Sequence, residues 1–459
     1  MPSSTTGPTL PGSTSKGGAG VRPTLFTVFA AALLVRFAAL TFATQAPLGE
    51  GEILLDAGGN IAAGRGLSLS DTLLRVPPHA PPILRRTLNQ WSEVGGVWGV
   101  VPPGRPTAFL PPLYPIMLSL FAPLPEGVLV SRILGVMIGS LTAALVYATA
   151  RRWGGSGAIA AGAFAVLDPL AAFQSAEIST HNVAAFTAFL PVWLASRRGG
   201  AGIAAAAGFI CGVAFLARPT AWLLVPLLGV VAWCRNSPRG AVLLVLGTVV
   251  ALSPWVIRNA HDLGRPLVFT TNGGRNLWEF NNQKMGPEYE WSEPQPSRPL
   301  YDPVRRRHTG TLRHPELLPF PAFTTESEWE RDRILTARFA GFAVANPRAY
   351  ADLVGIRITQ MLALWPLHAK GGLRLLFAAH SLPLLLLACV GAWGALRSDG
   401  LHRAVALFVM LFLALHVLTA AGFVYRGMIA PFLALLAGDG VSWLTCVRRA
   451  RHTQGRVMP

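Results

Sequence analysis

The sequence predicts an all-α polytopic membrane protein, a bundle of about ten transmembrane helices with a small extracytoplasmic region. Of its 459 residues, 52% are hydrophobic and only 13% are charged, about half the charged fraction of an average soluble domain. Five segments are nearly free of charge and approach the roughly 20 residues that cross a bilayer: Ser131–Ala150, Ala201–Ala217, Ala241–Val256, Leu373–Leu396 and Ala404–Phe423.

The formal net charge of +17 belongs to arginines at the ends of apolar segments rather than on one amphipathic face, which disfavours nucleic acid as a partner. The positive-inside rule orients the chain. If Pro112–Ala122 is an interfacial helix and not a span, every basic pair falls on the side of the two termini, the cytoplasm. These pairs and the last basic group are Arg151 and Arg152, Arg197 and Arg198, Arg235 and Arg239, Arg397 and Arg403, and Arg448, Arg449, Arg451 and Arg456.

This topology divides the chain into five parts. A disordered cytoplasmic tail (1–23) precedes an N-terminal transmembrane module (24–258) that includes the first outer loop (45–130). An extracytoplasmic cap (259–370) follows, in which Glu326–Tyr350 has helical periodicity. C-terminal transmembrane helices (371–447) and a basic cytoplasmic tail (448–459) complete the chain. We expect the protein in the cell's inner membrane, with membrane lipids around it.

Four strings follow one another in an order that resembles the GT-C glycosyltransferases. They are Pro111-Pro112-Leu113-Tyr114-Pro115, Pro254-Trp255-Val256-Ile257-Arg258-Asn259, Thr271-Asn272-Gly273-Gly274 with Phe280-Asn281-Asn282, and Asn346-Pro347-Arg348-Ala349-Tyr350. The pattern is most similar to bacterial members of the protein mannosyltransferase and lipid A aminoarabinose transferase superfamily, which includes the dolichyl-phosphate-mannose-protein mannosyltransferases. The resemblance covers roughly residues 24 to 445. It implies transfer of a hexosyl or pentosyl group from a polyprenyl-phosphate donor, on the extracytoplasmic face, to a lipid, glycan or protein acceptor.

The resemblance places a catalytic acid in the first outer loop, where this chain has Glu50, Glu52 and Asp56, ranked in that order. The leading Asp of the family pattern is absent, so an inactive relative stays open as a hypothesis. A positioned carboxylate can act as general base for an acceptor hydroxyl that attacks the anomeric carbon, which predicts inversion. The alternative is that these acids only solvate a loop beside the membrane. Glu50 and Glu52 together could also hold a divalent metal ion.

Cations are expected beside the lipid phosphate, whose negative charge develops as it leaves. The predicted topology puts Arg218, Arg258 and Arg426 at outer ends of spans, and the string around Arg426 resembles an Arg-containing motif that the family carries near its end. Each of these arginines could instead extend toward lipid headgroups. We also expect substrate contacts from three polar or aromatic positions: Tyr114, Asn259 and His181.

Several other polar positions lack an assigned role. Asp168 lies inside a span and so faces a cavity or a partner. No spacing of His, Asp or Cys predicts a metal site, and the four cysteines predict no disulfide. The competing functions are a transporter or flippase, which the absence of internal repeats disfavours, and an envelope polysaccharide polymerase or ligase, which should lack acids after the first span.

Overall fold

The computed structural model describes residues 23–42, 50–74, 101–154, 156–197, 199–282, 299–302, 307–311, 323, 326–366, 369–398 and 400–454. The predicted tail therefore lies outside the described residues except for Pro23. The helices are α1 (Leu25–Leu40), α2 (Glu50–Ala62), α4 (Leu113–Ser119), α5 (Gly127–Arg152), α6 (Ala158–Leu167), α7 (Pro169–Ala176), α8 (Thr180–Ala195), α9 (Ala201–Ala217), α10 (Leu224–Asp262), α11 (Gly273–Glu279), α12 (Glu328–Ala345), α13 (Pro347–Leu362), α14 (Gly371–Arg397), α15 (Leu401–Leu418) and α16 (Arg426–Gln454).

Three short 3-10 helices and one small sheet complete the secondary structure of the described residues. The 3-10 helices are η1 (Asp71–Leu74), η2 (Pro219–Leu223) and η3 (Phe423–Tyr425). The sheet pairs β1 (Pro299–Asp302) with β2 (Arg307–Thr311) in antiparallel register. The predicted cap segment Glu326–Tyr350 is helical in α12 and the start of α13, and the predicted basic tail continues α16 to Gln454.

The fold class is confirmed, since the chain is a helical, multi-pass membrane protein. Within the described residues, five helices are long and apolar enough to cross a bilayer, or six if the bent pair α6 and α7 counts as one span. This is fewer than the ten that the sequence predicts. The difference lies in shorter apolar helices, such as Leu25–Leu40, Ala201–Ala217 and Pro219–Arg235, which fall below the roughly 20 residues that a full crossing needs.

Hydrogen bonds gather the chain's basic pairs at one end of the bundle, which we call the basic end. The Tyr147 hydroxyl donates to the Pro23 carbonyl, which places the start of α1 beside the end of α5. Arg152 donates to Ser196 at the end of α8, and Arg235 donates to the Ala195 carbonyl. The grouping agrees with the predicted topology, in which these residues share one side of the membrane.

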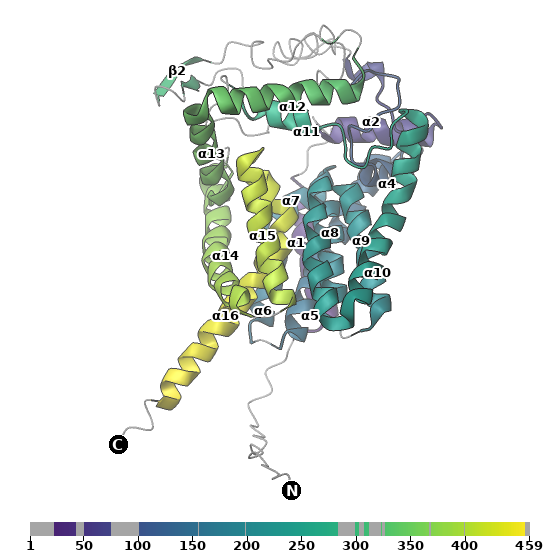
Figure 1. The fold of residues 1–459 in the computed structure, drawn as a ribbon. Coiled ribbons are helices and arrows are strands. Elements are labelled where there is room, and N and C mark those ends of the chain that lie inside the picture. Colours follow the sequence, from purple (N-terminus) through teal and green to yellow (C-terminus); the bar gives the residue numbers. More distant parts are fainter. Residues whose placement is uncertain are drawn as a thin grey trace.

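The opposite end, which we call the cap end, carries α2, α4, α11 and α12, and α12 runs across the bundle (Figure 1). Helix α4 is the predicted interfacial helix, and its seven residues are too few to span a bilayer. Ser327 caps α12 through a reciprocal capping box with Glu330. The next residue, Glu328, points inward and joins the first outer loop to the chain that follows α10.

That junction is a buried hydrogen-bonded group, which we call the clasp: Thr107, Ala108, Arg258, Thr271 and Glu328. The Glu328 carboxylate accepts from both threonine hydroxyls and from the Ala108 N–H at 3.0 Å. Arg258 donates to the Thr107 carbonyl at 2.8 Å and to the Leu67 carbonyl at 3.1 Å. The clasp therefore fixes the cap over the end of the bundle.

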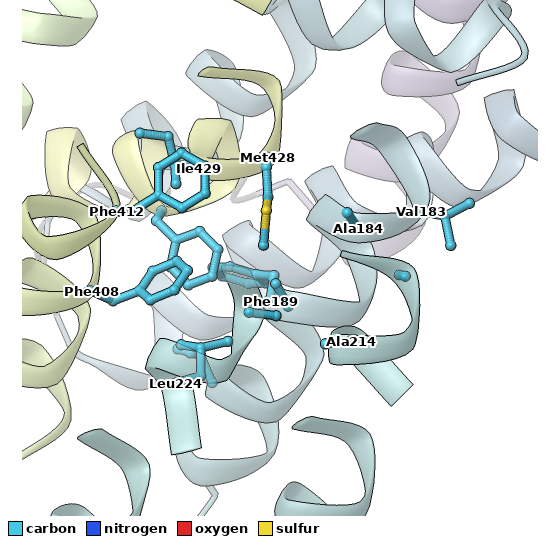
Figure 2. Close-up of a cluster of buried hydrophobic side chains, with 14 of the residues drawn as sticks. Val183, Ala184, Phe189, Ala214, Leu224, Phe408, Phe412, Met428 and Ile429 are labelled. Carbon is cyan, nitrogen blue, oxygen red and sulfur yellow. The ribbon is translucent and has the colours of Figure 1, made fainter. Parts of the chain in front are cut away.

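The core of the bundle is aromatic and aliphatic, and it joins helices that are distant in sequence (Figure 2). Phe189 of α8 packs edge to face on Phe432 of α16, with ring centroids 5.3 Å apart, and Phe408 of α15 lies 4.6 Å from Phe432. Glycines allow the closest helix contacts. A Cβ at Gly391 of α14 would lie 1.8 Å from the Leu436 carbonyl oxygen of α16, so only glycine permits this approach.

Candidate active site

Glu50 begins α2 at the cap end and is held in place by a residue from a different part of the chain. The Thr180 hydroxyl, at the start of α8, donates to Glu50 Oε1 at 2.8 Å. Helices α2 and α4 pack closely because position 58 is glycine: a Cβ there would lie 2.9 Å from Leu118 Cβ. This contact brings α4, with Tyr114, against the helix that carries Glu50.

The Tyr114 phenol faces Glu50 from α4. Its oxygen accepts a hydrogen bond from the backbone of Ser179. Burial raises the pKa of Tyr114, and the nearby Glu50 carboxylate raises it further. Tyr114 therefore remains a neutral phenol at physiological pH, able to donate one hydrogen bond beside the carboxylate.

The three acids proposed from the sequence occupy different environments. Asp56 accepts from the Ser70 backbone N–H at 2.7 Å and from Asn60 Nδ2 at 3.3 Å, so it holds the loop after α2. Glu52 lies on the exposed side of α2, where partial burial and then Asp56 raise its pKa. Of the three, Glu50 faces the polar residues of α4, α7 and α8.

Two charged residues that flank Glu50 were not selected from the sequence as site residues. Arg132, near the start of α5, is buried, and its Nε has no hydrogen-bond partner among the described residues. Glu177 follows α7; burial raises its pKa, while Arg132 opposes that rise. Arg132 was overlooked because a single arginine at the start of a predicted span is indistinguishable by pattern from one that anchors a helix in headgroups.

On the far side of Thr180 lies a set of rings from α8, α15 and η3. His181 Nδ1 is 2.8 Å from the Ser179 hydroxyl, and its buried Nε2 has no partner among the described residues. The Tyr425 ring packs against both His181 and His416, with centroids 5.9 Å and 5.1 Å away. The Arg218 guanidinium lies over the Tyr425 ring, 4.9 Å from its centroid.

Tyr425 connects this ring set to Glu50. It lies within electrostatic range of Glu50, Arg218, Glu279 and Arg275. Arg275 and Glu279 form a buried ion pair on α11, with Nη1 and Oε2 2.9 Å apart. We call the whole assembly the Glu50 cluster: Glu50, Tyr114, Arg132, Glu177, Thr180, His181, Arg218 and Tyr425.

The structure brings three of the predicted substrate contacts to Glu50: Tyr114, His181 and Arg218. Arg258 lies in the clasp, where it also forms an ion pair with Asp262 at 2.8 Å. Asn259 donates to the Leu267 carbonyl at 2.8 Å. Arg426 is buried under α13 and α14 and donates to the Ala363 carbonyl at 2.5 Å and to Ser381 Oγ at 3.1 Å.

The pair Glu50 and Glu52 does not fit a shared metal ion. Residues two apart on a helix point in different directions, and here Glu52 is exposed while Glu50 faces Thr180. Among the residues that the structure describes, no group of three or more His, Cys, Asp and Glu side chains is arranged to hold a metal.

Comparison with known proteins gives structural likeness without sequence likeness. No family model and no curated protein matches the chain. The fold is similar to an Archaeoglobus fulgidus oligosaccharyltransferase solved with Zn and sulfate, with a TM-score of 0.47 and 12% identity over 92% of this chain. It is also similar to ArnT from Cupriavidus metallidurans bound to undecaprenyl phosphate, with a TM-score of 0.39 and 15% identity.

This chain aligns with different fractions of the two neighbouring structures. The chain spans 50% of the oligosaccharyltransferase chain, about half its length, and 78% of the ArnT chain, in each case over more than nine tenths of its own residues. At these TM-scores and identities, the likeness indicates nothing about chemistry. The evidence for function is the arrangement of the residues in the Glu50 cluster.

Proposed function

We propose that the protein is a membrane glycosyltransferase that transfers a sugar from a polyprenyl-phosphate donor to an acceptor hydroxyl at the cap end of the bundle. The observation that carries the proposal is the position of Glu50, held by the Thr180 hydroxyl with Tyr114 and Arg132 nearby. The order of sequence strings that resembles GT-C glycosyltransferases supports it. The more specific resemblance to protein mannosyltransferases stays a prediction.

The proposed reaction is a single displacement. The acceptor oxygen forms a bond to the anomeric carbon as the bond from that carbon to the phosphate oxygen breaks, and the acceptor proton passes to the Glu50 carboxylate. The donor electrons leave with the polyprenyl phosphate, whose charge is stabilised by nearby cations. Attack opposite the leaving group inverts the anomeric configuration.

Residues of the cluster divide between these tasks. Thr180 orients the Glu50 carboxylate through its hydrogen bond. Arg132 acts on Tyr114 and Glu177, the neighbours of Glu50, and its Nε has no hydrogen-bond partner among the described residues, while Arg218 lies over the Tyr425 ring. We propose that Arg132 and Arg218 bind the lipid phosphate of the donor. Arg426 remains a weaker candidate for that role because its guanidinium donates to protein oxygens.

The experiment supplies the purified full-length protein with polyprenyl-phosphate-linked sugars and measures transfer and the anomeric configuration of the product. The proposal expects transfer with inversion from a lipid donor. Transfer from a nucleotide sugar instead, or retention, would reject it. Substrate movement into sealed vesicles without any glycosidic product would favour the transporter alternative.

Orientation is tested separately. The His261 side chain is 87% exposed at the cap end, so we expect a His261→Cys variant to react with a membrane-impermeant maleimide added outside intact cells. Cys446, which is exposed toward the basic end, is the matched control and should react only after the membrane is opened. The reverse pattern would place the Glu50 cluster in the cytosol.

A further inference from the structure

A break in the membrane bundle lies directly beneath the Glu50 cluster. Helix α6 ends at Leu167, α7 begins at Pro169, and the two are bent by 48°. Proline has no N–H, so the Ala165 carbonyl four residues earlier loses its helical donor. Asp168 caps α7, and its Oδ1 accepts from the Ala171 N–H at 3.1 Å.

Arg36 of α1 replaces the missing backbone donor. Its Nη2 donates to the Ala165 carbonyl at 3.2 Å, and its Nη1 lies 3.5 Å from the Val166 carbonyl. The Arg36 side chain is only 2% exposed. Because water cannot reach the hydrocarbon core, a broken helix there needs such a partner for its carbonyls. Arg36 therefore stabilises the break that Asp168 and Pro169 create.

A cavity of about 20 Å³ adjoins these two charged residues, enough room for about one water molecule. Its polar lining also includes Thr142, Gln174 and Asn182. Arg36 Nε has no hydrogen-bond partner among the described residues. A Cβ at Gly139 would lie 2.2 Å from Ser175 Oγ, 2.8 Å from Arg36 Nε and 3.1 Å from Asn182 Oδ1, so glycine at position 139 keeps this space open.

The charges around the cavity are close but not in contact. Asp168 lies within electrostatic range of Arg36 and Arg426. Within the described part of the chain, neither arginine approaches the Asp168 carboxylate to the 4.0 Å of a direct ion pair. A water molecule between Arg36 Nε and the carboxylate would satisfy both groups, since buried waters make two to four hydrogen bonds.

We propose that Arg36 and Asp168 form a water-bridged charge pair in this cavity, and that the pair positions Thr180 against Glu50 by fixing the bend between α6 and α7. Helix α7 (Pro169–Ala176), capped by Asp168, delivers Glu177, Ser179 and Thr180 to the cluster. Arg36 and Asp168 are thus positioning residues. The catalytic consequence rests on the proposed function, but the pair and its structural effect do not.

A double-mutant cycle tests the pair without an activity assay. Asn is as good a helix N-cap as Asp, so Asp168→Asn removes the charge and keeps the cap, while Arg36→Gln keeps a donor for the Ala165 carbonyl. Each single change should lower the Tm of the full-length protein in detergent by at least about 5 °C, because it leaves one buried charge without its partner. The double variant should lose clearly less than the sum.

Additive shifts, or no shift in either single variant, would overturn the pair. Gly139→Ala should also lower the Tm without changing charge, because its Cβ would lie 2.2 Å from Ser175 Oγ and 2.8 Å from Arg36 Nε. The matched control is Thr248→Val, which removes a buried polar group between α9 and α10 (Oγ1 to the Gly208 carbonyl, 2.9 Å). We expect Thr248→Val, which lies outside the cavity lining, to lower the Tm less than Gly139→Ala does.

Cross-linking tests the positioning. In a background where the four free cysteines are replaced, a short bifunctional thiol reagent should join Glu50→Cys to Thr180→Cys, because the hydrogen bond between the native side chains keeps the two positions close. Adding Asp168→Asn or Arg36→Gln should slow cross-linking by about fivefold, and adding Arg36→Lys, which keeps the charge, should slow it less. An unchanged rate in both neutralised variants would overturn the positioning role.

Kinetics separate this inference from the proposed function. In the transferase assay, Asp168→Asn should lower kcat about tenfold and leave KM for the donor within about twofold, since the base and not the donor site is displaced. A rise in KM for the donor as large as the fall in kcat would place the effect on donor binding and would reject positioning of the base. If the wild type transfers no sugar, the proposed function fails, whereas the cross-linking and Tm results still decide the pair.

Discussion

The Glu50 cluster and the clasp are both buried polar groups at the cap end, but they satisfy their hydrogen bonds differently. In the clasp, Glu328 accepts from three donors and Arg258 donates to two carbonyls. In the Glu50 cluster, His181 Nε2 and Arg132 Nε have no partner among the described residues. Buried polar atoms are normally paired, so unpaired ones that line a candidate site are open to a partner from a ligand or a water molecule.

The contrast indicates that the clasp stabilises the fold and that the Glu50 cluster binds and converts substrate. Removing a clasp residue should cost stability, and any loss of activity should follow from it. Removing a residue of the Glu50 cluster should cost activity with little loss of stability. The predictions below test this separation.

Apart from the loss of Glu50 itself, the largest expected effect is on the cation over Tyr425. Arg218→Gln should lower kcat/KM about 100-fold, the loss typical of one group that stabilises developing charge. The Tm should change little, because the guanidinium contacts the Tyr425 ring from one side and is partly exposed. Arg397→Gln, at the basic end over the Trp393 ring, is the matched control and should leave kcat/KM unchanged.

In the clasp, Glu328→Ala should lower the free energy of unfolding by about 2 kcal/mol, because it leaves buried donors on Thr107, Ala108 and Thr271 without an acceptor. Chemical denaturation of the detergent-solubilised protein measures the loss. Glu330→Ala removes only an exposed capping contact of the same helix and should cost less. Equal losses would mean that the clasp contributes no more than an ordinary cap.

For the unpaired histidine nitrogen, His181→Asn should lower kcat/KM about tenfold, the value of one lost hydrogen bond to substrate. Asparagine retains an acceptor near the position of Nδ1 for the Ser179 hydroxyl, so the Tm should stay within about 2 °C of wild type. A destabilised variant with normal kcat/KM would reverse the assignment and make His181 a structural residue.

The smallest expected effect concerns pH. Burial raises the pKa of Glu328 above the ordinary value of 4.5, so the folded state holds its proton over a range in which the unfolded chain has released it. The stabilising contribution is therefore complete below pH 4.5 and is lost as pH rises through the folded pKa. As the pH rises across this window, the Tm of the wild type should fall relative to the Tm of Glu328→Gln. A difference between the two Tm values that does not change with pH would contradict the raised pKa of Glu328.

The sequence was sufficient for the class of fold and for part of the site. Charge-free segments and paired arginines predicted a membrane bundle with one basic end, because these features depend on local composition. The sequence also selected Glu50, Tyr114, His181 and Arg218, which the structure brings together. The number of full spans was harder to predict, because a short apolar segment such as Ala201–Ala217 has the composition of a span but not its full length.

Other parts of the site depend on contacts between distant segments. Thr180 orients Glu50 across 130 positions of sequence, and Arg132 is near Glu177 only because α5 packs against α7. Arg258 and Arg426 have the same position in the pattern as Arg218, at the end of a span. Their carbonyl partners, which separate them from the Glu50 cluster, are visible only in three dimensions.

The most direct measurement is the rate of sugar transfer from a polyprenyl-phosphate donor by wild type, Glu50→Gln and Glu52→Gln, purified and assayed together. We expect Glu50→Gln to lose about 10²- to 10⁴-fold in kcat, as for a removed general base, while Glu52→Gln stays within about twofold of wild type. Equal rates for wild type and Glu50→Gln would contradict the account.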